Sequence, residues 1–156
     1  MKTLARSSLW LLLGGSLILA LSLGIRHGFG LFLPPMSAEF GWGREVFAFA
    51  IALQNLIWGL TQPFTGALAD RFGARRTVIV GGVLYAIGLG CMGLADSPLS
   101  LSLSAGLLIG IGLSGTSFSV ILGAVGRAVP MEKRSMAMGL AAAAGSFGQF
   151  AMLPGT

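Results

Sequence analysis

The residues that could do chemistry in this sequence are a few polar side chains set inside long apolar stretches. Arg26 and His27 lie near the end of the first stretch, and Asn55, Trp58 and Gln62 lie along the second. A polar or charged side chain in an apolar helix is costly unless it faces protein or water, so it marks a candidate solute site. Arg26 could attract a carboxylate, and His27 belongs to a residue type that can act as a proton carrier.

Each of these candidates also has a purely structural interpretation. Arg26 either faces a cavity or reaches toward the interface and anchors its helix. His27 is either a proton carrier or a packed interfacial group. Asn55 and Gln62 share one helical face, with Trp58 beside them, and they either line a solute path or bond neighbouring helices.

The fourth apolar stretch also contains small and hydroxyl-bearing residues that could serve either packing or solute binding. Gly106, Gly110, Ser114 and Ser117 form a small-residue face that predicts close helix packing. Ser114 and Ser117 could equally hydrogen-bond a solute, and the sequence leaves both interpretations open.

No reactive constellation accompanies these residues. The apolar stretches contain no acidic side chain, so paired carboxylates are absent from them, and Cys91 is the only cysteine, so no intrachain disulfide can form. We therefore expect no enzymatic activity, no cofactor and no metal site. The net charge of +5 sits in short clusters between apolar stretches, which indicates membrane topology rather than nucleic-acid binding.

The elements that must position these residues are membrane helices. The chain is 54% hydrophobic and 10% charged, against roughly 25% charged residues in soluble domains. A helix needs roughly 20 apolar residues to cross a bilayer. Five stretches meet this length and predict an all-α membrane protein with helices at about 9–33, 46–69, 78–95, 99–125 and 136–156.

Basic residues predict the orientation of these helices. Eight of the ten fall before the first stretch, between the second and third, or between the fourth and fifth. By the positive-inside rule these segments are cytoplasmic. The eight residues are Lys2, Arg6, Arg71, Arg75, Arg76, Arg127, Lys133 and Arg134.

The segment between the second and third stretches carries a motif. Gly66 permits close packing, Asp70 is an anion that can accept from a helix N-terminus or an arginine, and Gly73 permits a tight turn. Arg71, Arg75 and Arg76 supply cations at the membrane surface. The run GALADRFGARR over 66–76 resembles the cytoplasmic loop motif of the major facilitator superfamily, with Ala74 as a departure.

A second run narrows the resemblance. FGLFLPPM over 29–36, followed by EFGWGR over 39–44, is similar to the first outer loop of monocarboxylate and oxalate/formate members, with Gly43 in place of a usual serine. Pro34 and Pro35 are expected to end the first helix there. The fourth stretch lacks the internal arginine common in proton-coupled drug exporters.

The resemblance implies the N-terminal part of an alternating-access transporter in a bacterial-type inner membrane. In such a protein the missing C-terminal half completes the solute site, and the 66–76 loop acts in conformational switching. The expected partners are a small solute, the bilayer and that half, and the expected solute is a monocarboxylate or another organic anion. A drug or sugar transporter remains open, as does a stand-alone five-helix protein with a structural or regulatory role.

Overall fold

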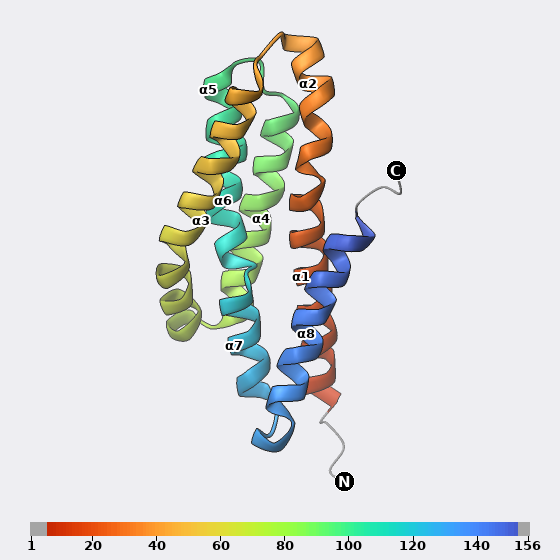
Figure 1. Cartoon of the computed structure of the whole chain (residues 1–156). Helices are drawn as coiled ribbons and strands as arrows, with labels where there is room; N and C mark the ends of the chain where they lie inside the picture. The colour runs from red at the N-terminus through yellow and green to blue at the C-terminus, as the bar shows by residue number, and fades with distance from the viewer. Residues whose placement is uncertain (1–5, 153–156) are drawn as a thin grey trace. The chain divides into compact units, whose positions relative to one another are not determined.

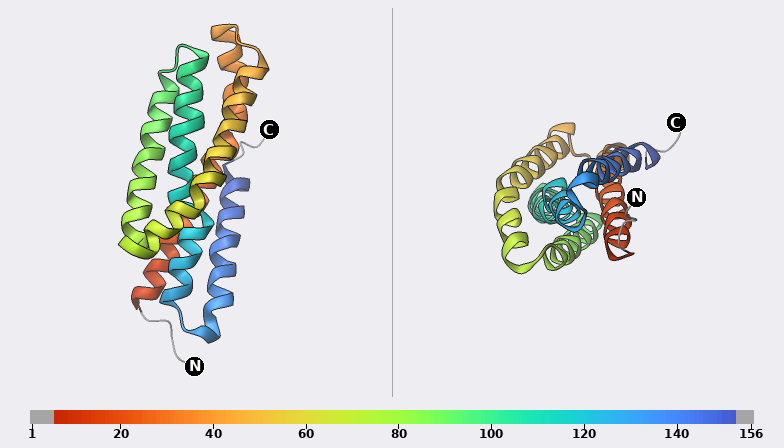
Figure 2. Two further views of the ribbon diagram at one scale, coloured as in Figure 1. Left: turned by 90° about the vertical axis from the view of Figure 1, so that its left-hand side faces the viewer. Right: turned by 90° about the horizontal axis from the view of Figure 1, so that it is seen from below.

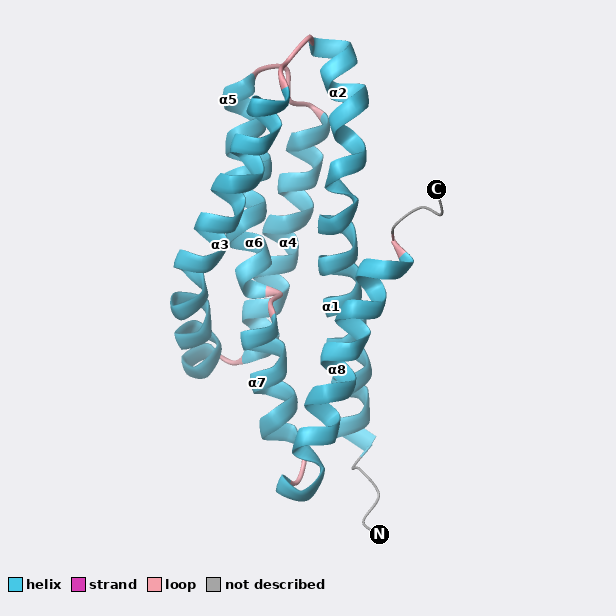
Figure 3. Cartoon of the chain, in the orientation of Figure 1, coloured by secondary structure: helices cyan, strands magenta, loops and turns pink. Residues whose placement is uncertain are grey.

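The protein is helical throughout the part that the structure, a computed structural model, describes. That part is residues 6–152, and its helices are joined by short loops (Figure 3). The prediction of an all-α membrane protein is confirmed, because the described elements are helices and several are apolar enough to cross a membrane. Such helices satisfy their backbone hydrogen bonds internally, as a bilayer requires. The last residues of the fifth predicted helix, 153–156, and the basic residue Lys2 lie outside the described residues.

Five helical runs make up residues 6–152. Three of them are long and apolar enough to cross a membrane: 6–40, 74–93 and 98–128. That α3 and α8 also cross the bilayer stays a prediction. The runs comprise α1 (Arg6–His27), η1 (Gly28–Phe32) and α2 (Leu33–Phe40); α3 (Arg44–Phe72); α4 (Ala74–Gly93); α5 (Pro98–Leu101), η2 (Ser102–Leu108), α6 (Ile109–Gly115) and α7 (Phe118–Ala128); and α8 (Met131–Ala151) (Figure 1).

The first run departs from the prediction at its prolines. Pro34 and Pro35 were expected to end the helix, but they lie in the first turn of α2, and the change of geometry occurs earlier, in the 3₁₀ turn over 28–32. A proline in the first turn removes no helical hydrogen bond, because that N–H has no partner within the helix. The prediction about these prolines was therefore wrong.

The fourth run contains two irregular segments. η2 is a π-helix of seven residues, and the helix is interrupted at Thr116 and Ser117, where Ser117 has extended backbone angles. Hydropathy along this run does not reveal either segment, because both consist of the same small and apolar residues as the regular helix around them.

The loop between the fourth and fifth runs is shorter than the segment predicted to be cytoplasmic, 126–135. α7 ends at Ala128 and α8 begins at Met131, with Pro130 before its first turn. Lys133 and Arg134 therefore belong to the first turn of α8.

Residues 6–28 and 117–152 belong to one compact unit, called unit 1. In it α1 packs along α8, and α7 packs on both (Figure 1). The contact between α1 and α8 depends on small residues: a Cβ placed on Gly148 would lie 2.6 Å from the carbonyl carbon of Ala20 and closer still to its Cα and oxygen. Glycine at such a position lets the backbones of two membrane helices approach each other closely.

Residues 29–116 form the second unit, unit 2, in which α3, α4, η2 and α6 pack together. α6 meets α4 through glycines: a Cβ on Gly81 would lie 2.8 Å from the Cα of Gly115. α3 is visibly curved and contains Pro63 (Figure 2).

Two tight turns connect the helices of unit 2. Gly73 joins α3 to α4 with φ 93°, a left-handed conformation that favours glycine. Between α4 and α5, the hydroxyl of Ser97 accepts the backbone N–H of Ser100, while the Ser100 hydroxyl accepts the N–H of Ser97. This capping box satisfies two donors that would otherwise lack helical partners.

Candidate functional site

α3 has two faces that differ in how the rest of unit 2 covers them. Its buried residues are Phe47, Ala50, Gln54 and Ala69. A second face carries residues spaced three or four apart that are exposed or half-buried. We call this face the α3 polar stripe, and it comprises Asn55, Gly59, Gln62, Gly66 and Asp70.

Within unit 2, no other helix packs tightly against the α3 polar stripe. A Cβ placed on Gly59 or on Gly66 would meet no atom within 4 Å, and the Asn55 side chain is exposed. Asn55 Nδ2 donates to the carbonyl of Ile51 in its own helix at 3.0 Å. The stripe is therefore a polar, glycine-containing surface on an otherwise apolar helix, and such a surface is unfavourable against lipid.

Gln62 and Ser114 are linked through Thr65. The Thr65 hydroxyl lies 3.0 Å from the carbonyl oxygen of Gln62 and 3.3 Å from that of Ser114, which joins α3 to α6. Ser114 is fully buried, and its own hydroxyl donates to the carbonyl of Ile111 at 2.7 Å. Ser114 is therefore buried within unit 2, whereas the half-buried Trp58 and Gln62 lie closer to the surface.

Gln54 is the polar residue whose importance the sequence did not show. Its side chain is fully buried, and Nε2 donates to the carbonyl of Ala105, in η2, at 2.7 Å. The Oε1 atom is buried without a hydrogen-bond partner. The acceptor carbonyl belongs to η2, in which the backbone follows the i→i+5 hydrogen-bond pattern of a π-helix. The adjacent amides Gln54 and Asn55 could have signalled that one faces inward.

The other three candidates belong to unit 1. Arg26 is half-buried near the end of α1, and His27 is exposed, with Nδ1 3.1 Å from the carbonyl oxygen of Leu23. Ser117 is buried at the start of α7, and its hydroxyl lies 2.8 Å from that of Ser119. Arg26 offers a cation at a half-buried position, which is the chemistry that an anionic solute requires.

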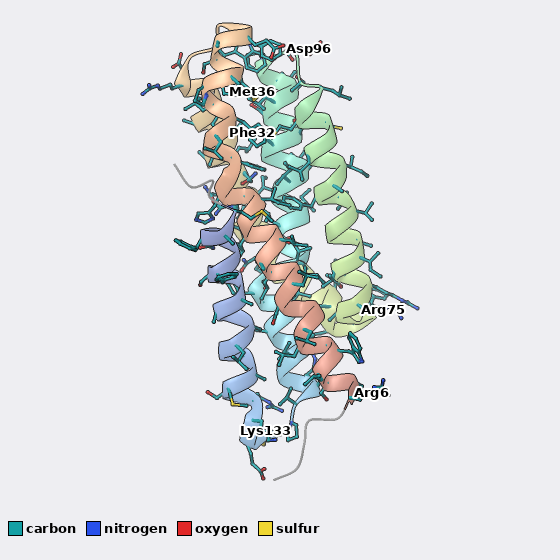
Figure 4. The ribbon with its side chains drawn as sticks, turned by 90° about the vertical axis from the view of Figure 1, so that its right-hand side faces the viewer. Arg6, Phe32, Met36, Arg75, Asp96 and Lys133 are labelled. Atoms are coloured by element: carbon teal, nitrogen blue, oxygen red, sulfur yellow. The ribbon has the colours of Figure 1, made fainter. Side chains whose placement is uncertain are left out.

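The 66–76 segment, at one end of unit 2, comprises the end of α3, Gly73 and the first turn of α4, so the turn between the two helices is a single residue. The N–H of Gly73 donates to the carbonyl of Ala69 at 3.0 Å, which closes α3 before α4 begins. Asp70, Arg71, Arg75 and Arg76 are all exposed. Figure 4 shows the Arg75 side chain projecting away from the first turn of α4. Charges at this turn are thus accessible to a neighbouring helix or to lipid headgroups.

No group of three or more histidine, cysteine, aspartate or glutamate residues within 6–152 is placed to hold an ion.

Comparison with known proteins identifies similarity over nearly the whole sequence. Residues 12–155 match the family model described as Major Facilitator Superfamily. Monocarboxylate transporter 11 of Mus musculus is 37% identical over 121 residues, which cover 78% of this chain and 27% of that protein. Its Homo sapiens counterpart is 35% identical over the same share of this chain and 25% of its own length.

A bacterial relative has a different stated role. Multidrug resistance protein MdtH of Proteus mirabilis is 41% identical over 81 residues, covering 49% of this chain and 20% of that protein. The chain thus spans about a quarter of the length of the curated relatives that it matches.

Proposed function

The chain belongs to the major facilitator superfamily, whose members move small solutes across membranes, and we propose that it supplies the first five helices of a transporter for a small organic anion. The observation that carries this proposal is the uncovered α3 polar stripe. A surface containing Asn55, Gln62 and Asp70 has no favourable position against lipid. It requires either a water-filled path or further protein.

The family architecture accounts for such a surface. In these transporters the solute site lies near the midplane between two halves, which rock against each other. We propose that the stripe faces the solute path and the second half of the transporter. The structural alternative, a five-helix protein acting alone, would have to cover the same stripe by pairing with another copy.

The choice of an organic anion rests on Arg26 and on the relatives. Arg26 is half-buried in a helical run that is apolar enough to cross a membrane, and a charged side chain within such a run most often marks a solute or ion path. A carboxylate is the partner that a guanidinium binds best. Two of the matched proteins are named monocarboxylate transporters.

A second candidate function, export of drugs, is favoured by the relatives named MdtH, which match shorter parts of the chain at 34–41% identity. Against it stands the fourth helical run, which has no charged residue before Arg127. Transport of a hydrophobic cation would be easier without a positive charge at Arg26.

Transport by the full-length gene product tests the choice of solute. In proteoliposomes we expect saturable uptake of a small monocarboxylate such as lactate. Arg26→Gln should raise its KM roughly tenfold, because a hydrogen bond to a charged group contributes about 1.5 kcal/mol or more. Arg44→Gln, which removes an exposed arginine from the start of α3, serves as the matched control and should leave the KM unchanged.

Two results would contradict this proposal. Saturable uptake of a hydrophobic cation without uptake of any monocarboxylate would favour the drug-export function. An unchanged KM in the Arg26→Gln protein would show that this arginine only anchors its helix.

The orientation in the membrane gives a separate prediction. We propose that the N-terminus and the 66–76 turn are cytoplasmic, because eight of the ten basic residues mark that side. Cysteines introduced at Ala74 and Ser37 in a Cys91→Ser background should react with an impermeant maleimide from opposite faces of the membrane. Only the cysteine at 37 should react in intact cells, and reaction of the cysteine at 74 there would reverse the orientation.

A further inference from the structure

A cavity of about 460 Å³ lies within unit 2 between α3, α4 and α6. This volume falls within the roughly 300–1,000 Å³ typical of small-molecule sites. The residues that line it from α3 are not members of the α3 polar stripe. Its lining includes Thr65, Leu68 and Phe72 from α3, Val80 and Leu84 from α4, and Ile111 from α6.

The interior of this cavity offers almost nothing to a polar molecule. Its aliphatic and aromatic side chains have no hydrogen-bonding groups, and the two threonine hydroxyls in its wall are already used. Thr65 is bonded to backbone carbonyls of α3 and α6, and Thr77 to the carbonyl of Gly73 at 3.3 Å. The part of a ligand that enters must therefore be apolar.

The charged residues in and beside the lining have the opposite character. Arg76 forms part of the lining, and the guanidinium of Arg71 lies 5.4 Å from the ring centre of Phe72, another lining residue. Arg75, beside them, projects from the first turn of α4 (Figure 4). With Asp70 as the only acidic residue, the segment 66–76 carries three positive charges and one negative charge, a net charge of +2.

We propose that this cavity holds an acyl chain of an anionic phospholipid whose phosphate is bound by Arg76 and Arg71. The acyl chain of such a lipid fits an apolar cavity. Its negatively charged headgroup fits two guanidinium groups, which bind phosphate well. Leu68 and Val80 leave about half of their surface exposed, 47% and 59%, so the cavity wall is open toward a bilayer. The site is separate from the proposed solute path.

Photolabelling of the full-length protein tests this lipid site. Phosphatidylglycerol with a diazirine in its acyl chain should label peptides of α3 and α4 that line the cavity, at least about fivefold more than phosphatidylcholine with the same chains. Arg76→Gln should reduce the labelling about fivefold, the factor that corresponds to about 1 kcal/mol for one arginine near an anionic surface. Arg44→Gln, at the other end of α3, should leave it unchanged.

A second pair of variants tests the apolar part. Leu84→Trp places a larger side chain in the cavity and should abolish the labelling there, whereas Val83→Trp, on the neighbouring exposed position that does not line it, should have no effect. Each variant should elute from size-exclusion chromatography as the wild type does. Equal labelling by both lipids would reduce the site to a general lipid-facing groove and overturn the proposal. Absence of labelling would overturn it too, because another part of the protein would then fill the cavity.

Discussion

Replacing Gly148 by alanine is expected to destabilise the protein by about 2 kcal/mol. The added Cβ would meet the Cα, carbonyl carbon and oxygen of Ala20, which belong to the backbone of α1 and cannot rotate away. Overpacking of this kind costs roughly 3 kcal/mol. Alanine regains about 1 kcal/mol through its higher helix propensity. Heating the purified protein in detergent and measuring the monodisperse fraction should show a Tm lowered by roughly 4–8 °C.

Gly139 provides the matched control on the same helix. A Cβ at this position meets no atom within 4 Å, so Gly139→Ala gains the helix propensity without a clash and should leave the Tm unchanged or raise it. Equal Tm values for the two variants would show that α1 and α8 do not approach each other as closely as in this structure.

Asp70→Asn is expected to reduce the transport rate of the full-length protein by roughly tenfold to a hundredfold. Asp70 is exposed at the end of the α3 polar stripe, where it can accept hydrogen bonds from a helix N-terminus or an arginine of the second half. Charged hydrogen bonds contribute roughly 1.5–3 kcal/mol each, which corresponds to that range of rates if one conformational state depends on them. Initial uptake rates, normalised to the amount of protein in the membrane, measure the effect.

Asp96→Asn is the control, since Asp96 is another exposed aspartate and lies in the turn before α5. It should transport at the wild-type rate. A normal rate for Asp70→Asn, with normal insertion of both variants, would mean that the 66–76 turn has no part in the conformational change.

The helical architecture was predictable because it depends on composition averaged over about 20 residues. An uninterrupted apolar stretch such as 78–95 has no alternative to a helix in a bilayer, and α4 occupies 74–93. Gly73 was predictable as a turn for a local reason, since its conformation is one that other residues avoid.

The irregular segments were not predictable because they depend on hydrogen-bond register rather than composition. A π-helix at 102–108 and the 3₁₀ turn at 28–32 differ from an α-helix in which carbonyl each N–H bonds, and serine, glycine and leucine are compatible with each.

The same limit applies to the candidate site residues. Gln54 and Asn55 are neighbours in sequence, and only the packing against η2 shows that Gln54 is buried and bonded to Ala105 while Asn55 is exposed. The roles of Arg26, His27 and the α3 polar stripe in binding a solute remain predictions, because the covering surface belongs to protein beyond this chain in the proposed transporter.

The close contact between Gly148 and Ala20 has a consequence for biosynthesis. These residues are 128 positions apart, so the ribosome completes α1 long before the partner helix α8 exists. At about 5–20 residues per second, α1 waits roughly 6–25 s for that partner. During this interval the small-residue surface around Ala20 and Gly24 is open to any helix that can approach it. The small-residue surface of α1 is therefore covered by its partner only after translation has delivered α8.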